Sequence, residues 1–202
     1  MEPAPGAPPL WDSIRDGSRY FAGEGKLHET VRRLVARLEE EAIPYAIVGG
    51  LALLAHGYRR LTEDIDVLLT EPGLERMRER MIGRGLRPAF EGAGSTFRDA
   101  ETGIRIEVVK TGDYPGDGKP KPVRFPDPER ARERREGIWI IPLPALVELK
   151  LASGLSAPHR LKDLADVQEL IAARDLPRDL ADDLDASVRT KYLELWDAVG
   201  NR

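Results

Sequence analysis

Two aspartates, one residue apart, are the part of the sequence best suited to chemistry. Asp64 and Asp66 lie in the run Asp-Ile-Asp-Val-Leu at positions 64–68. In a strand, alternate side chains share a face about 6.5 to 7 Å apart, so both carboxylates project together while Ile65 and Val67 point into the core. At an effective dielectric constant of about 20, the two charges repel by roughly 2 to 3 kcal/mol. A divalent cation removes this cost, because Mg²⁺ takes its ligands from carboxylates, phosphates and water.

A pair of glycines lies upstream of the aspartates. The run Tyr45–Val48 predicts a strand, Gly49-Gly50 breaks it, and residues 51–55 are good helix formers. The first amide groups of such a helix have no partner within the helix, an arrangement that suits a phosphate. A glycine pair or an Asp-x-Asp run is by itself more often structural than functional. Their combination, with apolar flanks, favours a phosphate and metal site.

Together the two motifs resemble those of the nucleotidyltransferase superfamily related to DNA polymerase beta. That family carries a hydrophobic residue, Gly and Gly or Ser, then a spacer, then Asp-hydrophobic-Asp/Glu-hydrophobic. Residues 48–50 and 64–67 match this pattern. Residues 60–66, Arg-Leu-Thr-Glu-Asp-Ile-Asp, are similar to the form found in minimal bacterial members and in AbiE-type toxin enzymes.

The resemblance implies a third carboxylate, usually Asp, on a neighbouring strand. The best match is Glu107 in the alternating run 104–109, with Ile106 and Val108 inward and Glu107 on the opposite face. Glutamate is one methylene longer than the family residue, so two roles stay open for it, metal ligand or acceptor of a proton.

The resemblance thus implies a set of site residues, each with a role. Asp64, Asp66 and Glu107 would be catalytic and would hold Mg²⁺, or Mn²⁺. The nucleotide would be bound by Gly49, Gly50, Arg60 and Thr62.

A second, softer resemblance lies in the C-terminal part. Residues 141–154 and 160–166 are similar to the helical part of the AbiE-type enzymes, in which a helix lysine faces the triphosphate and a later aspartate is important. Carried over, these nucleotide-binding residues are Lys150, Asp163 and Asp166. The apolar neighbours of Lys150 predict a half-buried ammonium that needs an anionic partner, although a snorkelling lysine is an alternative. Capping or ion pairing is the alternative for the aspartates.

The function predicted on this basis is Mg²⁺-dependent transfer of a nucleoside monophosphate from an NTP to a hydroxyl acceptor. A tRNA 3′ end or similar RNA is favoured, and the basic segment 119–136 could meet its phosphates. One alternative is nucleotidylation of a protein, with a partner from a toxin–antitoxin pair. Another is a catalytically weakened nucleotide-binding or partner-binding module, which a glutamate at position 107 slightly favours and the intact aspartate pair disfavours.

The elements that must position these residues follow from hydrophobic periodicity. The sequence predicts helices over 29–41, 51–56 and 73–84, strands over 45–48, 65–69 and 137–141, a hairpin of 96–98 with 104–109, and about three helices after residue 141. This order indicates an α+β, α/β-like fold: a short mixed sheet with flanking helices, plus a C-terminal helical region.

Composition divides the chain and limits its class. We expect a flexible leader over 1–20, a nucleotidyltransferase core over 21–115, a Pro/Gly-rich basic linker over 116–137, and a C-terminal strand and helical region over 138–202. The 202 residues include 41% hydrophobic ones, 31 basic against 35 acidic side chains, and no cysteine. A disulfide scaffold and a zinc–thiolate site are thereby excluded. Without an apolar run near the ~20 residues of a membrane span, a cytoplasmic protein is expected.

Overall fold

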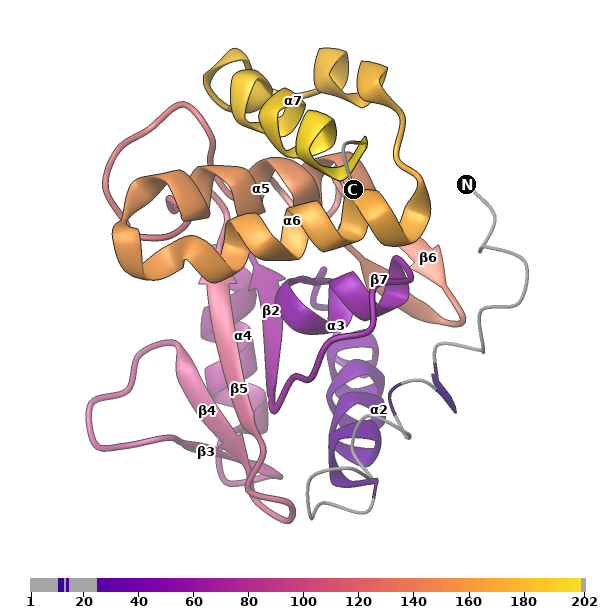
Figure 1. The fold of residues 1–202 in the computed structure, drawn as a ribbon. Coiled ribbons are helices and arrows are strands. Elements are labelled where there is room, and N and C mark those ends of the chain that lie inside the picture. Colours follow the sequence, from indigo (N-terminus) through magenta and orange to yellow (C-terminus); the bar gives the residue numbers. More distant parts are fainter. Residues whose placement is uncertain (1–10, 13, 15–24, 201–202) are drawn as a thin grey trace.

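One mixed β-sheet runs through the molecule (Figure 1), and its strands β2 and β5 carry the predicted catalytic carboxylates. The computed structural model describes residues 11, 12, 14 and 25–200. The strand order is β3-β4-β5-β2-β1-β7-β6. The strands are β1 (Ala46–Ile47), β2 (Asp64–Leu69), β3 (Leu86–Pro88), β4 (Thr96–Asp99), β5 (Arg105–Lys110), β6 (Glu133–Arg135) and β7 (Ile138–Ile140).

Helices cover both faces of this sheet. They are α2 (Lys26–Glu40), α3 (Gly49–Ala55), α4 (Glu71–Met81), α5 (Leu143–Ser156), α6 (Leu161–Arg174) and α7 (Ala186–Gly200), with short 3-10 helices η1 (Pro158–Arg160) and η2 (Arg178–Asp183). Helices α5 and α6 run side by side above β2 and β5, and α7 lies over them (Figure 1). Among the helices described, none is both long enough and apolar enough to cross a bilayer.

The alternation of β2 divides the apolar core into two clusters. Ile65 and Val67 are fully buried on the face covered by α2 and α4, which confirms the predicted inward direction of these side chains. Leu68 points the other way and packs with residues of α5, α6 and α7. Because Asp64 and Asp66 share the face of Leu68, the carboxylates lie on the side of the sheet that faces α5 and α6.

The sheet agrees with the predicted α+β class, but one of its ends, β7 and β6, extends beyond the expected core. Strand β7 pairs in parallel with β1, Ile47 opposite Ile140, so the C-terminal strand belongs to the core sheet. Residues 133–135, expected in the linker, form edge strand β6 against β7. Pattern analysis also did not predict β3. Strands of three residues carry too little periodicity to be recognised, and pairing with a neighbour defines them.

The expected leader lies mostly outside the described residues. Of its described residues, Ile14 is buried in the core, and Trp11 Nε1 donates a hydrogen bond to the carbonyl of Glu136 (3.1 Å). These two residues of the expected leader thus contact the folded part of the chain.

Candidate active site

Helix α3 begins where β1 ends, and its first residue lies against Asp66. Gly49 has a φ of +62°, and a Cβ there would lie 1.9 Å from Asp66 Oδ2. The N–H of Gly50 donates a hydrogen bond to the Asp66 carboxylate. The glycine pair therefore allows a carboxylate, and not only a phosphate, to approach the amino terminus of the helix.

We expect Gly49→Ala to be costly for this reason. The new methyl group must displace Asp66, and a non-glycine residue at this φ adds about 1 to 2 kcal/mol, so a total loss of stability of at least about 3 kcal/mol is expected. Urea unfolding of Gly92→Ala is the matched control, because Gly92 has a φ of +81° but nothing within 4 Å of its hypothetical Cβ. Equal losses in the two variants would mean that contact with Asp66 is unimportant.

The carboxylate of Glu107 lies beside that of Asp66, on the neighbouring parallel strand. Asp66 on β2 is in register with Glu107 on β5, and Asp64 is in register with Arg105. Burial, then the charge of Glu107 and that of Asp64, raise the pKa of Asp66 to about 6, although Lys150 and the Gly50 amide act in the opposite direction. The predicted catalytic residues are thus close enough for their charges to interact.

This raised pKa makes stability depend on pH. Asp66 has a higher pKa in the folded protein, about 6, than its ordinary 3.8, so its ionisation disfavours folding. The resulting stability is complete below about pH 4 and is lost as pH rises through 6, by at most about 3 kcal/mol. Without divalent cations, Asp66→Asn should therefore melt above the wild type at pH 7.5 and level with it at pH 4. Melting curves at both pH values measure this, and a variant that melts well below the wild type at pH 7.5 would contradict it.

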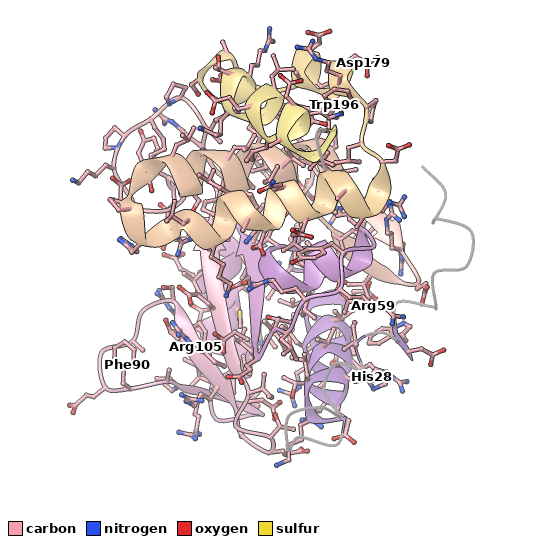
Figure 2. The ribbon with its side chains drawn as sticks, in the orientation of Figure 1. His28, Arg59, Phe90, Arg105, Asp179 and Trp196 are labelled. Atoms are coloured by element: carbon pink, nitrogen blue, oxygen red, sulfur yellow. The ribbon has the colours of Figure 1, made fainter. Side chains whose placement is uncertain are left out.

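Arg105 is a site residue that sequence analysis missed. Its Nη2 donates a hydrogen bond to Glu107 Oε2 (2.8 Å), and its Nη1 lies 4.0 Å from Asp64 Oδ2. Figure 2 shows its side chain beside β5, below the layer of α5 and α6. The two-residue spacing of Arg105 and Glu107 on an alternating strand was the available signal, because it places both on one face.

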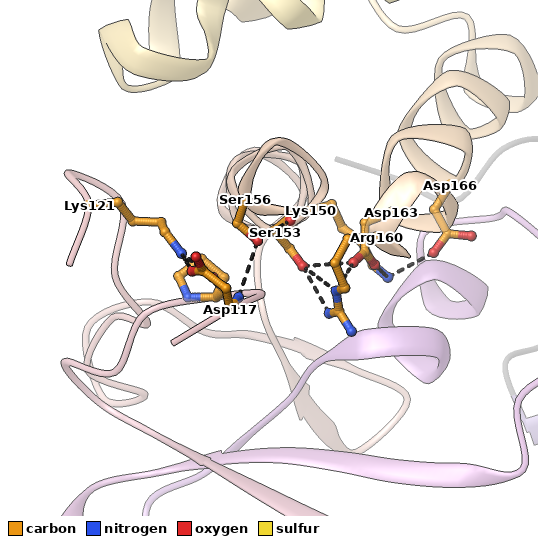
Figure 3. Close-up of polar contacts among 9 residues, drawn as sticks. Asp117, Lys121, Lys150, Ser153, Ser156, Arg160, Asp163 and Asp166 are labelled. Atoms are coloured by element: carbon orange, nitrogen blue, oxygen red, sulfur yellow. Dashed lines mark hydrogen bonds and ion pairs between the residues drawn. The ribbon is translucent and has the colours of Figure 1, made fainter. Parts of the chain in front are cut away.

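A buried ion network joins α5 to α6 (Figure 3). Lys150 Nζ lies 2.7 Å from Asp163 Oδ1 and 2.7 Å from Asp166 Oδ2. Ser153 Oγ donates to Asp163 Oδ2 (2.7 Å), and Arg160 Nε lies 2.9 Å from the same oxygen. Burial acts to raise the pKa of Asp163, but Lys150, Ser153 and Arg160 outweigh it, and the pKa is lowered. The anionic partner that Lys150 needed is a pair of aspartates.

Arg60 and Thr62 lie at the edge of this network. Arg60 Nε is 3.3 Å from Asp166 Oδ1, yet it is buried and has no aligned hydrogen-bond partner. Thr62 Oγ1 donates to the carbonyl of Asp64 (3.1 Å), and a Cβ on Gly50 would lie 2.7 Å from it. Gly50 is therefore needed for close packing of Thr62 against α3.

Every predicted site residue except Asp166 lines one cleft of about 540 Å³ between the sheet and α5–α6. Asp166 is almost fully buried and contacts Lys150 and Arg60. The structure thus brings together residues that are far apart in the sequence, from Gly49 to Asp163.

The expected linker also forms a wall of the cleft. Gly112 N–H donates to the Phe125 carbonyl (2.8 Å), which closes a loop, and Asp117 N–H donates to Ser156 Oγ at the end of α5 (3.1 Å). Gly116 has a φ of +80° and approaches so closely that a Cβ there would lie 2.1 Å from Ser156 Oγ. Gly116 and Phe125 line the cleft, so this part of the segment has a fixed position on α5.

Solved structures of similar shape define the fold. The solution structure of the antibiotic-resistance factor ANT(2″)-Ia is similar over 85% of this chain and 96% of that one, with 15% identity and a TM-score of 0.53. The chain has the nucleotidyltransferase fold. The crystal structure of ANT(2″)-Ia with adenylyl-2″-tobramycin has a TM-score of 0.51 at 15% identity, over 86% and 97% of the two chains.

An antigenic nucleotidyltransferase-like protein from Paracoccidioides brasiliensis also has a TM-score of 0.51 at 15% identity, over 86% of this chain and 87% of that one. No family model matches the sequence, and no curated protein matches it. Identities this low establish the fold alone.

On this fold, the carboxylates are suited in chemistry to a divalent cation. Asp64 and Asp66 offer hard oxygen donors, and the pKa of Asp66 is raised first by its burial and then by the negative charges of Glu107 and Asp64. Within the described ranges, no three Asp, Glu, His or Cys side chains converge closely enough to form a complete cage. Mg²⁺ usually takes one or two protein carboxylates and completes its shell with phosphates and water. The residues therefore fit a cation that binds together with a nucleotide.

Proposed function

We propose that this protein is a nucleotidyltransferase that moves a nucleoside monophosphate from an NTP to a hydroxyl acceptor. The observation that carries the proposal is the placement of Asp66 beside Glu107, with Asp64 on the same face, at the amino terminus of α3 and in one cleft. A protein selected only to fold gains nothing from an unfavourably ionised carboxylate at this position.

In this proposal Asp64 and Asp66 hold Mg²⁺ or Mn²⁺. When bound, the cation neutralises charge that develops on the departing pyrophosphate. Glu107, whose side chain is 40% exposed, would accept the proton of the acceptor hydroxyl or complete the cation's ligands. Gly49 and Gly50 let the nucleotide, as well as Asp66, approach the start of α3, and Thr62 forms the edge of the cleft.

The charge of the ion network supports a polyanionic substrate. Three cations, Arg60, Lys150 and Arg160, contact only two carboxylates, those of Asp163 and Asp166. The cluster therefore carries one net positive charge at the wall of the cleft, and Arg60 Nε lacks a hydrogen-bond partner. A triphosphate would balance the positive charge and would accept a hydrogen bond from Arg60 Nε. Asp163 and Asp166 would then act indirectly, by positioning the three cations.

For the acceptor we propose an RNA 3′ end, such as that of tRNA, as in the AbiE-type enzymes that the sequence resembles. A protein hydroxyl, in a toxin–antitoxin pair, is the alternative within the same chemistry. The neighbour solved with adenylyl-2″-tobramycin carries the nucleotide on a small molecule, so this class of acceptor belongs in the test. The absence of cysteine fits a reducing compartment, and we propose a cytoplasmic location.

One observation favours a second function, a nucleotide-binding module without transfer. Arg105 already donates a hydrogen bond to Glu107, so this carboxylate is not free to bind a cation or to accept a proton. A module of this kind would bind NTP through the same ion network but would not turn it over.

The test is incubation with each labelled NTP and Mg²⁺ in the presence of total RNA, lysate protein or an aminoglycoside. The expected result is that label enters RNA, and that this labelling is abolished when EDTA is present during the reaction or when the enzyme is Asp66→Asn. Asp113→Asn is the control, because this exposed carboxylate lies outside the cleft lining. NTP binding without label in any acceptor would establish the module, and neither binding nor label would refute the proposal.

A further inference from the structure

Arg105 is the basic residue that contacts two of the predicted catalytic carboxylates, those of Glu107 and Asp64. In the described part of the chain it is the one Lys or Arg that pairs with Glu107 or Asp64. The contact follows from the register of the sheet: Asp64 lies opposite Arg105 on β2, and Glu107 lies two residues further along β5 on the same face. The strands themselves, and not a mobile loop, hold the guanidinium between the two acids.

This contact engages Glu107 with a cation on its own strand. The Arg105 guanidinium lies 2.8 Å from Glu107 Oε2, so the charge of this carboxylate is balanced without a metal. The carboxylates of Asp64 and Asp66 are then left without Glu107 as a third ligand, in agreement with the lack of a three-ligand cluster in the described residues.

We propose that Arg105 is an internal counter-ion that withholds Glu107 from the cation site, so that Arg105 and a divalent cation compete for this carboxylate. The inference rests on the proposed function, because it concerns the same cation site. Arg105 is thereby a positioning residue: it sets where Glu107 lies and how tightly the protein binds metal before nucleotide arrives. The pair is about 40% exposed on both sides, so the competition is modest and reversible.

Mn²⁺ binding, measured by electron paramagnetic resonance without nucleotide, tests this role. The variants are Arg105→Gln, Glu107→Gln and the two combined. Arg98→Gln is the matched control. Arg98 is paired in register with Arg105 on β4, carries the same charge, and donates to the carbonyl of Gly103 (2.8 Å) instead of to a carboxylate. Melting curves verify that each variant is folded.

The expected result is that Arg105→Gln tightens Mn²⁺ binding about three- to fivefold, more than Arg98→Gln does, and that most of this gain is lost when Glu107 is already Gln. An equal gain with and without Glu107, or no gain beyond that of Arg98→Gln, would overturn the role of Arg105, because charge alone would then explain the effect. If the wild type and all variants bind no Mn²⁺ without nucleotide, the role of Arg105 is overturned, and if they bind none with NTP present as well, the metal site of the proposed function itself fails. That outcome differs from tight binding that is insensitive to Arg105.

Discussion

Transfer activity should fall by about a thousandfold or more in Asp64→Asn and in Asp66→Asn, with the fold intact. Both substitutions remove a negative charge from the face that would hold the cation, and neither side chain contributes to the apolar clusters. Asparagine keeps an oxygen that can accept the Gly50 N–H, so the start of α3 remains satisfied. Labelled-NTP transfer and far-UV circular dichroism measure the two effects.

The control for this loss is Asp113→Asn, which should keep full activity. Turnover near the wild-type level in either site variant would remove these carboxylates from the mechanism. A loss of activity accompanied by a loss of helix signal would instead assign them to folding.

Lys150→Met should destabilise the protein by about 3 to 5 kcal/mol, which is roughly 10 °C in melting temperature for a chain of this size. The substitution leaves Asp163 and Asp166 buried without the ammonium that lies 2.7 Å from each. Sequence resemblance alone would assign Lys150 to the triphosphate. The structure adds a cost in folding, and urea unfolding at pH 7.5 measures it.

A rescue variant separates lost charge from lost packing. Lys150→Met combined with Asp163→Asn and Asp166→Asn removes the two buried carboxylates that lost the ammonium and keep Arg160 and Arg60 as their remaining cationic partners, so part of the lost stability should return. The lost stability should also shrink as pH falls and Asp163 becomes protonated, because the lowered pKa of Asp163 contributes its full stability only above the ordinary pKa. A triple variant as unstable as Lys150→Met would mean that the lysine acts through its packing.

Local pattern alone was enough to predict the carboxylates of β2. The alternation Asp64-Ile65-Asp66-Val67 fixes which side chains share a face, because a strand repeats every two residues whatever its partners are. The glycine pair likewise predicts the start of a helix, although contact with Asp66 Oδ2 could not be foreseen. For the same reason, Glu107 could be placed on the correct face of β5 from the sequence.

What only the tertiary structure decided is how these local pieces meet. The register of β2 against β5 pairs Arg105 with Glu107, and the packing of α5 on α6 turns Lys150 toward two aspartates instead of toward the cleft alone. Strand β7 enters the sheet beside β1 although about ninety residues separate Ile47 from Ile140. Contacts between residues so distant in the sequence depend on the path of the whole backbone between them. Hydrophobic periodicity states which face is buried, but not which side chain on another element lies opposite.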